Sequence, residues 1–535
     1  MAGVCTCEAW LIGNVPLDRG NAHQLIFQSQ SAQLSYFLGK QVAHMVEATY
    51  IRKTGQLSFS AEVDNVDSAN YLVFKNNDFD GRYYFAYVLE MDYTNPNVTN
   101  VMFEIDSFQT YMHDIEYYSS FVEYEHSASD ELFEHLLVNN NLPTGPTIAR
   151  MQDGWSEVAE TRTLVAVSKK YSPDYNPESY GPETERQIGG SIANVFSGNA
   201  YYAFNDDQTE AIKELIKGMD EKGWGDAISN IWMVPAFTVG GAGSGSLITN
   251  LPEQTLTKSV AMNVSDIDGY VPRNKILFNY PYNYLVVSTQ NGQTTELRYE
   301  LFTGGSCEFL AVGTPHCPAQ VRCTPRNYAG QLMAFDNSVV LSGWPVCTWT
   351  NDVYSNYVGQ NFNGLMLGGA VDAIKAVAGL GMMVMAPAGA MGLMGASLMA
   401  SGGIGVASDL AGLADKANRP PMSSGQTGTG ALNMANNFMT FGFYPMTITA
   451  EYAKMIDDWY TCYGYPTMRY KVPNLFSRSN FNYVKTKAIH FGGSIPSEHR
   501  EKISSMFNSG VTLWHNGSTM YRYDLPNEVT GNGEE

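Results

Sequence analysis

The chain has 535 residues, of which 44% are hydrophobic and 12% aromatic, so it can form packed cores and is not a disordered chain. Charged residues make up only 16%, against roughly 25% in an ordinary soluble protein, and such a surface suits assembly into something larger. The formal net charge of −21 excludes a strongly basic surface and argues against sequence-specific recognition of DNA or RNA. An acidic wall facing DNA is useful only where DNA must slide past it.

The start of the chain predicts no secretory signal, because MAGVCTCEAW has neither a basic region nor an apolar core. The seven cysteines are an odd number in a large chain, so we expect reduced thiols made in a cytosol. His316, Cys317 and Cys323 lie close together, but no second ligand pair follows at the spacing of a zinc finger. The pattern favours packing over a metal site.

Residues 1–150 are expected to be rich in β structure. Apolar residues alternate along residues 83–91 and again along residues 101–105, with Pro96 in the turn between them. This pattern predicts a hairpin with one face buried. Asn76, Asp78 and Asp80 resemble the start of a calcium loop, but Tyr87 stands where such a loop needs Glu, which favours a polar turn.

The strand-and-turn character continues through residues 151–350, with one predicted helix over residues 209–222. Good capping residues, Asn205 to Asp207, precede this helix, and apolar residues follow at helical spacing. The glycine-rich run 240–246 predicts a flexible connection. A second hairpin is predicted from residues 284–287 and 295–301, with Asn291-Gly292 in its turn, and residues 266–269 are expected to form a turn.

The composition changes at Gly364, and residues 376–408 then hold no charged side chain, eight glycines and six methionines. Their length is enough for one tilted membrane span, but so many glycines make a poor permanent helix. An apolar, flexible and uncharged segment suits conditional insertion into a membrane. Residues 370–377 could form a short amphipathic entry helix, and a polar run at 420–430 closes the region.

Ten residues in this segment are expected to meet lipid: Met382, Met383, Val384, Met385, Met391, Leu393, Met394, Leu398, Met399 and Ile404. Two other interpretations stay open. The segment could be a buried core hairpin, or it could be a permanent transmembrane anchor, although its flanks are not basic.

The C-terminal part predicts a helix, strands, a second helix and a final strand. Apolar residues between Tyr452 and Tyr463 form a helical stripe, and Ser497 is expected to cap the second helix ahead of a strand at 511–514. Asp457 and Asp458 are adjacent on the first helix and should point to different sides, which argues against a paired-carboxylate glycosidase site.

No catalytic signature is visible in the sequence. It contains no phosphate-binding G-x-x-x-x-G-K-[ST] loop, no H-E-x-x-H, no G-x-S-x-G and no G-x-G-x-x-G following a strand. We therefore expect neither an enzyme nor a cofactor, and we assign no catalytic or metal-binding residue.

Several blocks in the chain resemble a known family. They are residues 68–78, 84–88, 103–106 and 109–112, then 471–475, 481–487 and 508–515 near the other end, with a weaker match at 280–282. These blocks, and the order in which they follow one another, are similar to those of the tail knob, or distal tail tube, proteins of short-tailed phages of the picovirus (phi29-type) group.

The resemblance implies a homohexameric tube at the end of a short tail, through which the genome leaves without sequence-specific DNA binding. It also implies a long apolar loop that plugs the lumen and later penetrates the host cytoplasmic membrane; residues 364–413 occupy the matching place. The implied partners are other tail proteins at both ends of the tube. The implied location is the virion tail, after assembly in the host cytoplasm.

We therefore predict a β-rich α+β, multidomain, tube-forming protomer. Residues 1–150 with 436–535 would form a discontinuous body, residues 151–345 further β-rich domains, and residues 346–435 the apolar, glycine-rich loop region. Two alternatives of other classes stay open: a passive structural tail protein without membrane activity, and a tail-borne cell-wall hydrolase. A cellular pore-forming toxin is a more distant one.

Overall fold

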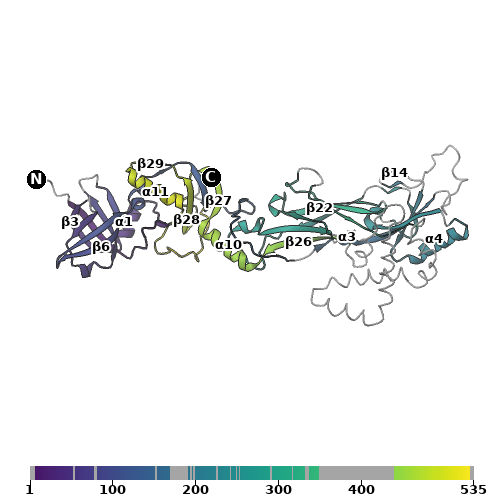
Figure 1. The fold of residues 1–535 in the computed structure, drawn as a ribbon, viewed down its shortest axis with the longest axis horizontal. Helices are drawn as coiled ribbons and strands as arrows, with labels where there is room; N and C mark the ends of the chain where they lie inside the picture. Colours follow the sequence, from purple (N-terminus) through teal and green to yellow (C-terminus); the bar gives the residue numbers. More distant parts are fainter. Residues whose placement is uncertain are drawn as a thin grey trace, which may run out of the picture. The chain divides into compact units, whose positions relative to one another are not determined.

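The structure is a computed structural model that describes residues 6–530 with internal gaps. The gaps are residues 52–54, 77–80, 151–152, 169–190, 193–194, 197–198, 225–226, 241, 249, 252–253, 290–291, 316, 332–335 and 349–438. The chain divides into two compact units, each built from separate stretches of sequence (Figure 1). Unit 1 consists of Met1–Gly145, Gly269–Phe278 and Thr449–Glu535; unit 2 consists of Pro146–Asp268 and Asn279–Ile448.

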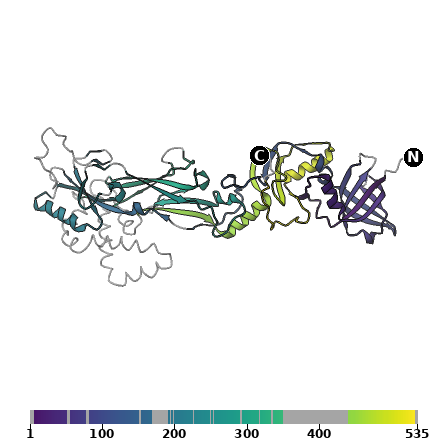
Figure 2. The same ribbon diagram turned by 180° about the vertical axis from the view of Figure 1, so that it is seen from behind.

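The predicted fold class, a β-rich α+β protein with several sheets, is confirmed. Strands dominate both units, and short helices lie beside the sheets (Figures 1 and 2).

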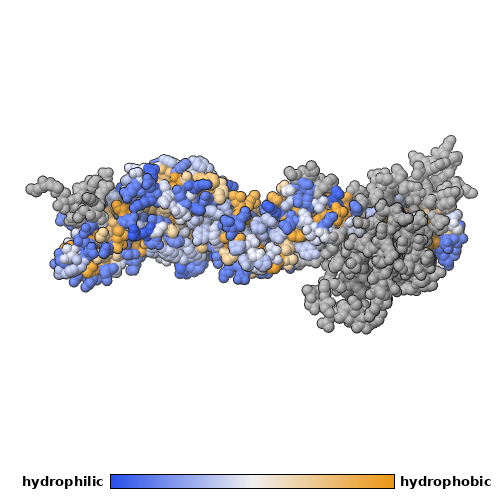
Figure 3. All heavy atoms as spheres, viewed as in Figure 1, coloured by the Kyte–Doolittle hydropathy of each residue, from blue (hydrophilic) through white to orange (hydrophobic). Residues whose placement is uncertain are grey.

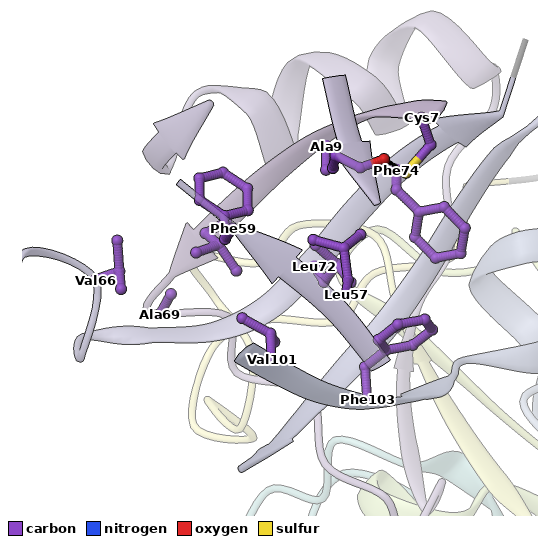
Figure 4. Packing of buried hydrophobic residues seen from close by; sticks show 13 residues of the cluster. Cys7, Ala9, Leu57, Phe59, Val66, Ala69, Leu72, Phe74, Val101 and Phe103 are labelled. Atoms are coloured by element: carbon purple, nitrogen blue, oxygen red, sulfur yellow. Dashed lines mark hydrogen bonds between the residues drawn. The ribbon is translucent and has the colours of Figure 1, made fainter. Parts of the chain in front are cut away.

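Unit 1 begins with a closed six-stranded barrel in the order β1-β3-β4-β7-β6-β5. Aliphatic and aromatic side chains fill its interior, where Leu57, Leu72 and Phe74 lie near Val101 and Phe103 (Figure 4). The barrel strands are β1 (Thr6–Gly13), β3 (Gln41–Ile51), β4 (Gln56–Phe59), β5 (Ala69–Asn76), β6 (Tyr83–Asn95) and β7 (Val98–Ile105).

The predicted hairpin of residues 83–105 exists as β6 and β7, but the expectation of one buried face is wrong. Ala86 and Phe103 face the barrel interior, whereas Phe85 and Tyr87 belong to a second apolar cluster around Phe37. Both faces of β6 are therefore buried at residues 85–87. The reason is that helix α1 (Gln30–Leu38) and other parts of unit 1 cover the outer side of the barrel there.

A five-stranded sheet with the order β2-β30-β28-β9-β27 forms the rest of unit 1. Val484, Val511 and Leu513 pack with Phe507 on one side of this sheet. The strands are β2 (His23–Leu25), β9 (Ser120–Glu125), β27 (Tyr465–Lys471), β28 (Phe481–Ala488) and β30 (Val511–Trp514), with a small separate pair of β8 (Glu116–Tyr117) and β29 (Phe491–Gly492).

The predicted C-terminal helices are confirmed as α10 (Ala450–Tyr463) and α11 (Ser497–Ser509), and α2 (Ser107–Tyr111) precedes them in unit 1. The predicted cap is wrong, because Pro496 occupies the capping position and Ser497 is the first helical residue. The predicted stripe on α10 is only partly buried: Ile456 and Tyr460 are inaccessible, while Met455 and Tyr463 are exposed.

The described residues of unit 2 form four sheets, with the strand orders β10-β26-β20-β21, β17-β15-β12-β16-β25, β14-β13-β18 and β19-β22-β23-β24; β11 also pairs with β26. Its strands are β10 (Thr147–Ala149), β11 (Asp153–Gly154), β12 (Thr161–Ser168), β13 (Ser191–Ile192), β14 (Val195–Phe196), β15 (Asn199–Asn205), β16 (Ile228–Pro235), β17 (Ser246–Ile248), β18 (Asn250–Leu251), β19 (Gln254–Ala261), β20 (Asn283–Thr289), β21 (Thr294–Leu297), β22 (Ser306–Thr314), β23 (Gln320–Pro325), β24 (Val339–Ser342), β25 (Val346–Thr348) and β26 (Phe441–Ile448). The α-helices among the described residues of unit 2 are α3 (Ser156–Ala159) and α4 (Thr209–Glu221).

The predicted helix over residues 209–222 is confirmed as α4, whose Ile216 and Met219 are buried against β12 and β15. Its predicted cap is wrong: Gln208 holds the capping position, and Asp206 accepts a hydrogen bond from Thr161 Oγ1 instead. The second predicted hairpin is confirmed as β20 and β21, but β21 ends at Leu297, and a 3-10 turn (Tyr299–Leu301) follows. Asp268 and Gly269 form the predicted turn with positive φ.

Candidate functional site

The ten residues predicted to meet lipid, and residues 364–413 as a whole, lie outside the described part of the chain. Among the described residues, no helix is long and apolar enough to span a membrane. The candidate functional surfaces that the structure does describe lie on the barrel of unit 1.

Two strands of the barrel extend past their neighbours on one side. β5 pairs with β6 only from Tyr83 to Tyr87, while β6 continues along β7 to Asn95. In the same way β4 pairs with β3 only from Thr49 to Ile51, while the earlier part of β3 pairs with β1 alone. Among the described strands, residues 88–95 and 41–48 therefore each leave one edge without a strand partner.

The side chains on these two edges are exposed and partly apolar. Val46 on β3 is 65% exposed, and Leu89 and Tyr93 on β6 are 43% and 60% exposed. Carboxylates alternate with them at Glu47 and Glu90. An exposed strand edge offers backbone N–H and C=O groups to another strand, and these edges are long enough to accept one.

A buried polar network fixes the base of the barrel. Asp106 caps α2 by accepting a hydrogen bond from the Gln109 backbone N–H at 3.0 Å, and it accepts another from Tyr71 Oη at 2.9 Å. The Gln109 amide donates in turn to the Leu25 carbonyl at 2.6 Å and to Gln24 Oε1 at 3.1 Å. The network holds α2 and β2 against the barrel strands, because each of these buried groups finds a partner.

Burial shifts the pKa values of the carboxyl and phenol groups in this network. It raises the pKa of Asp106, although hydrogen bonds from Tyr87, Gln109 and Tyr71 act in the opposite direction. It also raises the pKa of Tyr71 and of Tyr87, and the nearby Asp106 adds to both shifts. The phenols therefore stay protonated and remain hydrogen-bond donors.

An ion-pair cluster lies beside this network. Glu104 accepts from both Arg19, at 2.8 Å, and Lys502, at 3.0 Å. Burial acts to raise the pKa of Glu104, but the bonds and charges of Lys502 and Arg19 outweigh it and lower the pKa. A cavity of about 30 Å³ next to the cluster has room for about one water molecule and none for a substrate.

The adjacent carboxylates of α10 both bind the segment Gly269–Phe278. Their side chains differ in exposure, with Asp457 buried and Asp458 56% exposed. They nevertheless share one partner, because the Arg273 guanidinium contacts both. Asp457 also accepts hydrogen bonds from Tyr270 Oη at 2.7 Å and from the backbone N–H of Asn274 at 3.0 Å. Both carboxylates therefore hold the segment Gly269–Phe278 within unit 1.

The two cysteines considered as metal ligands, Cys317 and Cys323, differ in exposure. Cys323 is 1% exposed, and burial raises the pKa of its thiol, whereas Cys317 is exposed. His316 lies outside the described residues. No cluster of three or more His, Cys, Asp or Glu side chains suited to a metal occurs in the described part of the chain.

Comparison with known proteins gives two family matches. Residues 6–116, which include the barrel, match the caudoviral major tail protein N-terminus. Residues 247–528, more than half of the chain, match the C-terminal domain of tail knob protein gp9 of Bacillus phage phi29. The chain belongs to the tail knob protein gp9 family.

Relatives of this tail knob family match the chain over nearly its full length. Tail knob protein gp9 of Bacillus phage B103 is 24% identical, covering 97% of this chain and 98% of the relative, and gp9 of phage phi29 is also 24% identical with the same coverage. The solved structure of the bacteriophage C1 tail knob protein, gp12, has the same fold: its TM-score is 0.63 at 14% identity, over 98% of this chain and 100% of that one. The predicted family is confirmed, and the chain is a structural component of the virion tail.

The sequence did not predict the unpaired strand edges of the barrel. The alternation that predicted the hairpin ended at Met91, although β6 continues to Asn95. Tyr93, which is exposed beside the polar turn, could have indicated the longer strand. It continues the alternating apolar residues of 83–91 beyond Met91, where the predicted strand ended.

Proposed function

We propose that six copies of this chain form a ring-shaped conduit for genome ejection, and that residues 364–413 plug its lumen and then penetrate the host cytoplasmic membrane. Membership of the tail knob family supports the structural role. The run of 33 uncharged residues, 376–408, is the single observation that carries the membrane step. Lipid excludes charged side chains at a cost of several kcal/mol each, so a segment without any can enter it.

The unpaired edges of β3 and β6 support the ring. They lie on different strands, so the edge of β6 in one copy can pair with the edge of β3 in the next. Such head-to-tail pairing makes a closed ring when the rotation between copies closes. Other tail proteins would join both ends of this ring, after assembly in the host cytoplasm.

The charge of the chain supports unhindered passage of DNA. Six copies at −21 each bring −126 to one ring, so a predominantly acidic lumen would repel phosphates instead of binding them. DNA would therefore slide through without sequence-specific contacts. The same segment could instead act only as a plug, in a tail protein without membrane activity, and that alternative separates from the proposal in the following experiment.

The membrane step is tested by dye release from liposomes as the pH is lowered from about 7.5 to about 4.5, covering the range in which histidines titrate. We expect release by the full chain and at least a tenfold lower rate for the double variant Val384→Asp, Leu393→Asp. The matched control places the same two charges in the polar run, as Ser423→Asp and Ser424→Asp, and should leak like the unmodified chain. Equal release by all three proteins would refute a membrane role for the segment.

A further inference from the structure

Four polar side chains lie together inside unit 2, at one end of the sheet that holds β20 and β26. Asn283, Tyr299 and Thr447 are inaccessible to solvent, and Asn263 is partly buried. Hydrophilic residues occupy much of the surface that Figure 3 shows, so polar side chains have ample room outside the core. Burying a polar group is costly unless it finds a hydrogen-bond partner, so the position of these four needs a physical reason.

Strand register places Asn283 and Thr447 next to each other. The two residues are directly opposite in the antiparallel pair of β20 and β26, so their side chains lie on the same face of the sheet. The following pair on this face, Leu285 with Pro445, is apolar. The polar pair therefore ends an otherwise apolar row and is not part of a polar surface.

Two contacts bring Asn263 and Tyr299 to this pair. Asn283 Nδ2 donates a hydrogen bond to the Asn263 carbonyl at 2.6 Å. Burial raises the pKa of Tyr299, and the Asn263 backbone beside its hydroxyl group acts in the opposite direction. The phenol therefore stays protonated and keeps a hydrogen that it can donate.

Three atoms of this cluster make no hydrogen bond within the described part of the chain: Asn263 Nδ2, Tyr299 Oη and Thr447 Oγ1. The side-chain oxygen of Asn263 accepts from Arg150 Nη1 at 3.4 Å, which identifies the other amide atom as the donor. Buried polar atoms nearly always bond to protein or to ordered water. Three such atoms in one cluster therefore point to a bound molecule.

The chemistry of the three atoms specifies the class of this molecule. Asn263 Nδ2 can only donate, whereas the two hydroxyl groups can donate or accept. A ligand that satisfies all three must both accept and donate, as water does. The amide N–H group would repel a metal ion, and none of the three atoms is bonded to a positively charged side chain of the described residues that could hold an anion.

We propose that an ordered water molecule binds between Asn263, Tyr299 and Thr447 and forms part of the folded structure of unit 2. The water accepts from Asn263 Nδ2 and from Tyr299 Oη and donates to Thr447 Oγ1. This gives it the three or so hydrogen bonds that a buried water typically makes. The inference depends neither on the proposed ring nor on the membrane segment.

The position of the water gives it a structural role. Unit 2 consists of two stretches of sequence and so has four ends: Pro146, Asp268, Asn279 and Ile448. Within five positions of each end, in the same order, lies a residue of the cluster or of its contacts: Arg150, Asn263, Asn283 and Thr447. The water and the hydrogen bonds around it therefore join the four places where the chain enters or leaves unit 2.

The test uses Tyr299→Phe and Thr447→Val in the full chain, since each substitution removes one hydroxyl group and keeps the size of the side chain. Each variant takes one partner from the water, so calorimetry should show a thermal midpoint lowered by roughly 2–4 °C. The double variant should lose less than the sum of the two, because both hydroxyl groups bind the same molecule. Without a ligand, removing an unbonded buried hydroxyl would leave the midpoint unchanged or raise it.

Thr238→Val is the matched control in unit 2, because Thr238 Oγ1 donates directly to the Pro235 carbonyl at 2.7 Å. It should lower the midpoint on its own, and its loss should add in full to that of Tyr299→Phe, since the two residues share no partner. Unchanged or raised midpoints for Tyr299→Phe and Thr447→Val would overturn the inference, and so would full additivity of these two substitutions.

A high-resolution electron cryomicroscopy map of the unmodified protein gives an independent measurement. At a resolution that shows other buried waters, we expect a separate peak within hydrogen-bonding distance of Tyr299 Oη and Thr447 Oγ1. A map without this peak, or one in which the two hydroxyl groups bond directly to each other, would contradict the proposal.

Discussion

Individual glycines and buried polar side chains set the geometry of unit 1. Gly464 ends α10 at φ +66° and ψ −163°, a conformation almost restricted to glycine, and an added Cβ would lie 2.2 Å from the Glu125 carbonyl oxygen. A helix followed by glycine was visible in the sequence. The close approach to β9 was not, because that contact joins residues more than 300 positions apart.

Gly464→Ala should therefore destabilise unit 1 by at least about 3 kcal/mol, since backbone strain and a clash with the main chain add together. Gly269→Ala is the matched control: φ is +82° there, but nothing lies within 4 Å of an added Cβ, so the expected loss is only about 1 kcal/mol. Calorimetry of both variants measures the difference. Equal losses would show that the clash with Glu125 does not occur.

His126 makes the stability of unit 1 sensitive to acid. Its Nδ1 accepts from the Tyr483 backbone N–H at 2.7 Å, and its Nε2–H donates to the Thr461 carbonyl at 3.0 Å. The contact with Tyr483 requires the neutral ring, because a protonated Nδ1 cannot accept a hydrogen bond. Burial, aided by the nearby charges of Arg478 and His515, lowers its pKa to about 3. The unfolded chain takes up the proton near pH 6.5, so stability is complete above that pH and falls as the pH falls toward 3.

At pH 5 this loss amounts to roughly 2 kcal/mol relative to pH 7.5. His126→Gln keeps a donor and an acceptor but cannot titrate, so its thermal midpoint should fall less between these pH values than that of the unmodified chain. His490→Gln, at an exposed histidine, controls for the loss of an imidazole. Parallel pH profiles for the unmodified chain and His126→Gln would contradict the assignment of the neutral ring.

At the scale of elements, apolar periodicity predicted several helices and strands, but it did not predict how distant strands pair. The hairpin of β6 and β7, helices α4, α10 and α11, and strand β30 follow from local patterns, because each carries its apolar period within a few residues. The closed barrel could not be read in this way, because β1 pairs with both β3 and β5 across the sequence. The sequence also did not predict that the segment Gly269–Phe278 belongs to unit 1, because its place there depends on Asp457, far along the chain.

The unpaired barrel edges lead to a prediction about assembly. Val46→Glu and Leu89→Glu place a charge on each edge next to an existing carboxylate, so a neighbouring strand would meet two negative charges. We expect hexamer formation to weaken at least tenfold in sedimentation velocity, with an unchanged thermal midpoint because both residues are exposed. The control Val529→Glu, at a residue 40% exposed, should assemble normally. Rings of unchanged affinity from both edge variants would exclude pairing at these edges.

At the scale of the whole molecule, composition and family agree. A chain with few charged residues, a net charge of −21 and no catalytic motif suits a structural part of a larger assembly, and the chain belongs to a tail knob family. The predicted lipid-facing residues, from Met382 to Ile404, stay a prediction, because they lie outside the described part of the chain. Their number and lack of charge make them testable by substitution without any structural detail.

Electron cryomicroscopy of the tail before and after ejection into liposomes tests the central claim most directly. We predict six copies around one axis, with residues 364–413 inside the lumen before ejection and within the lipid bilayer afterwards. A ring with another number of copies, or the same segment packed in protein in both states, would contradict it.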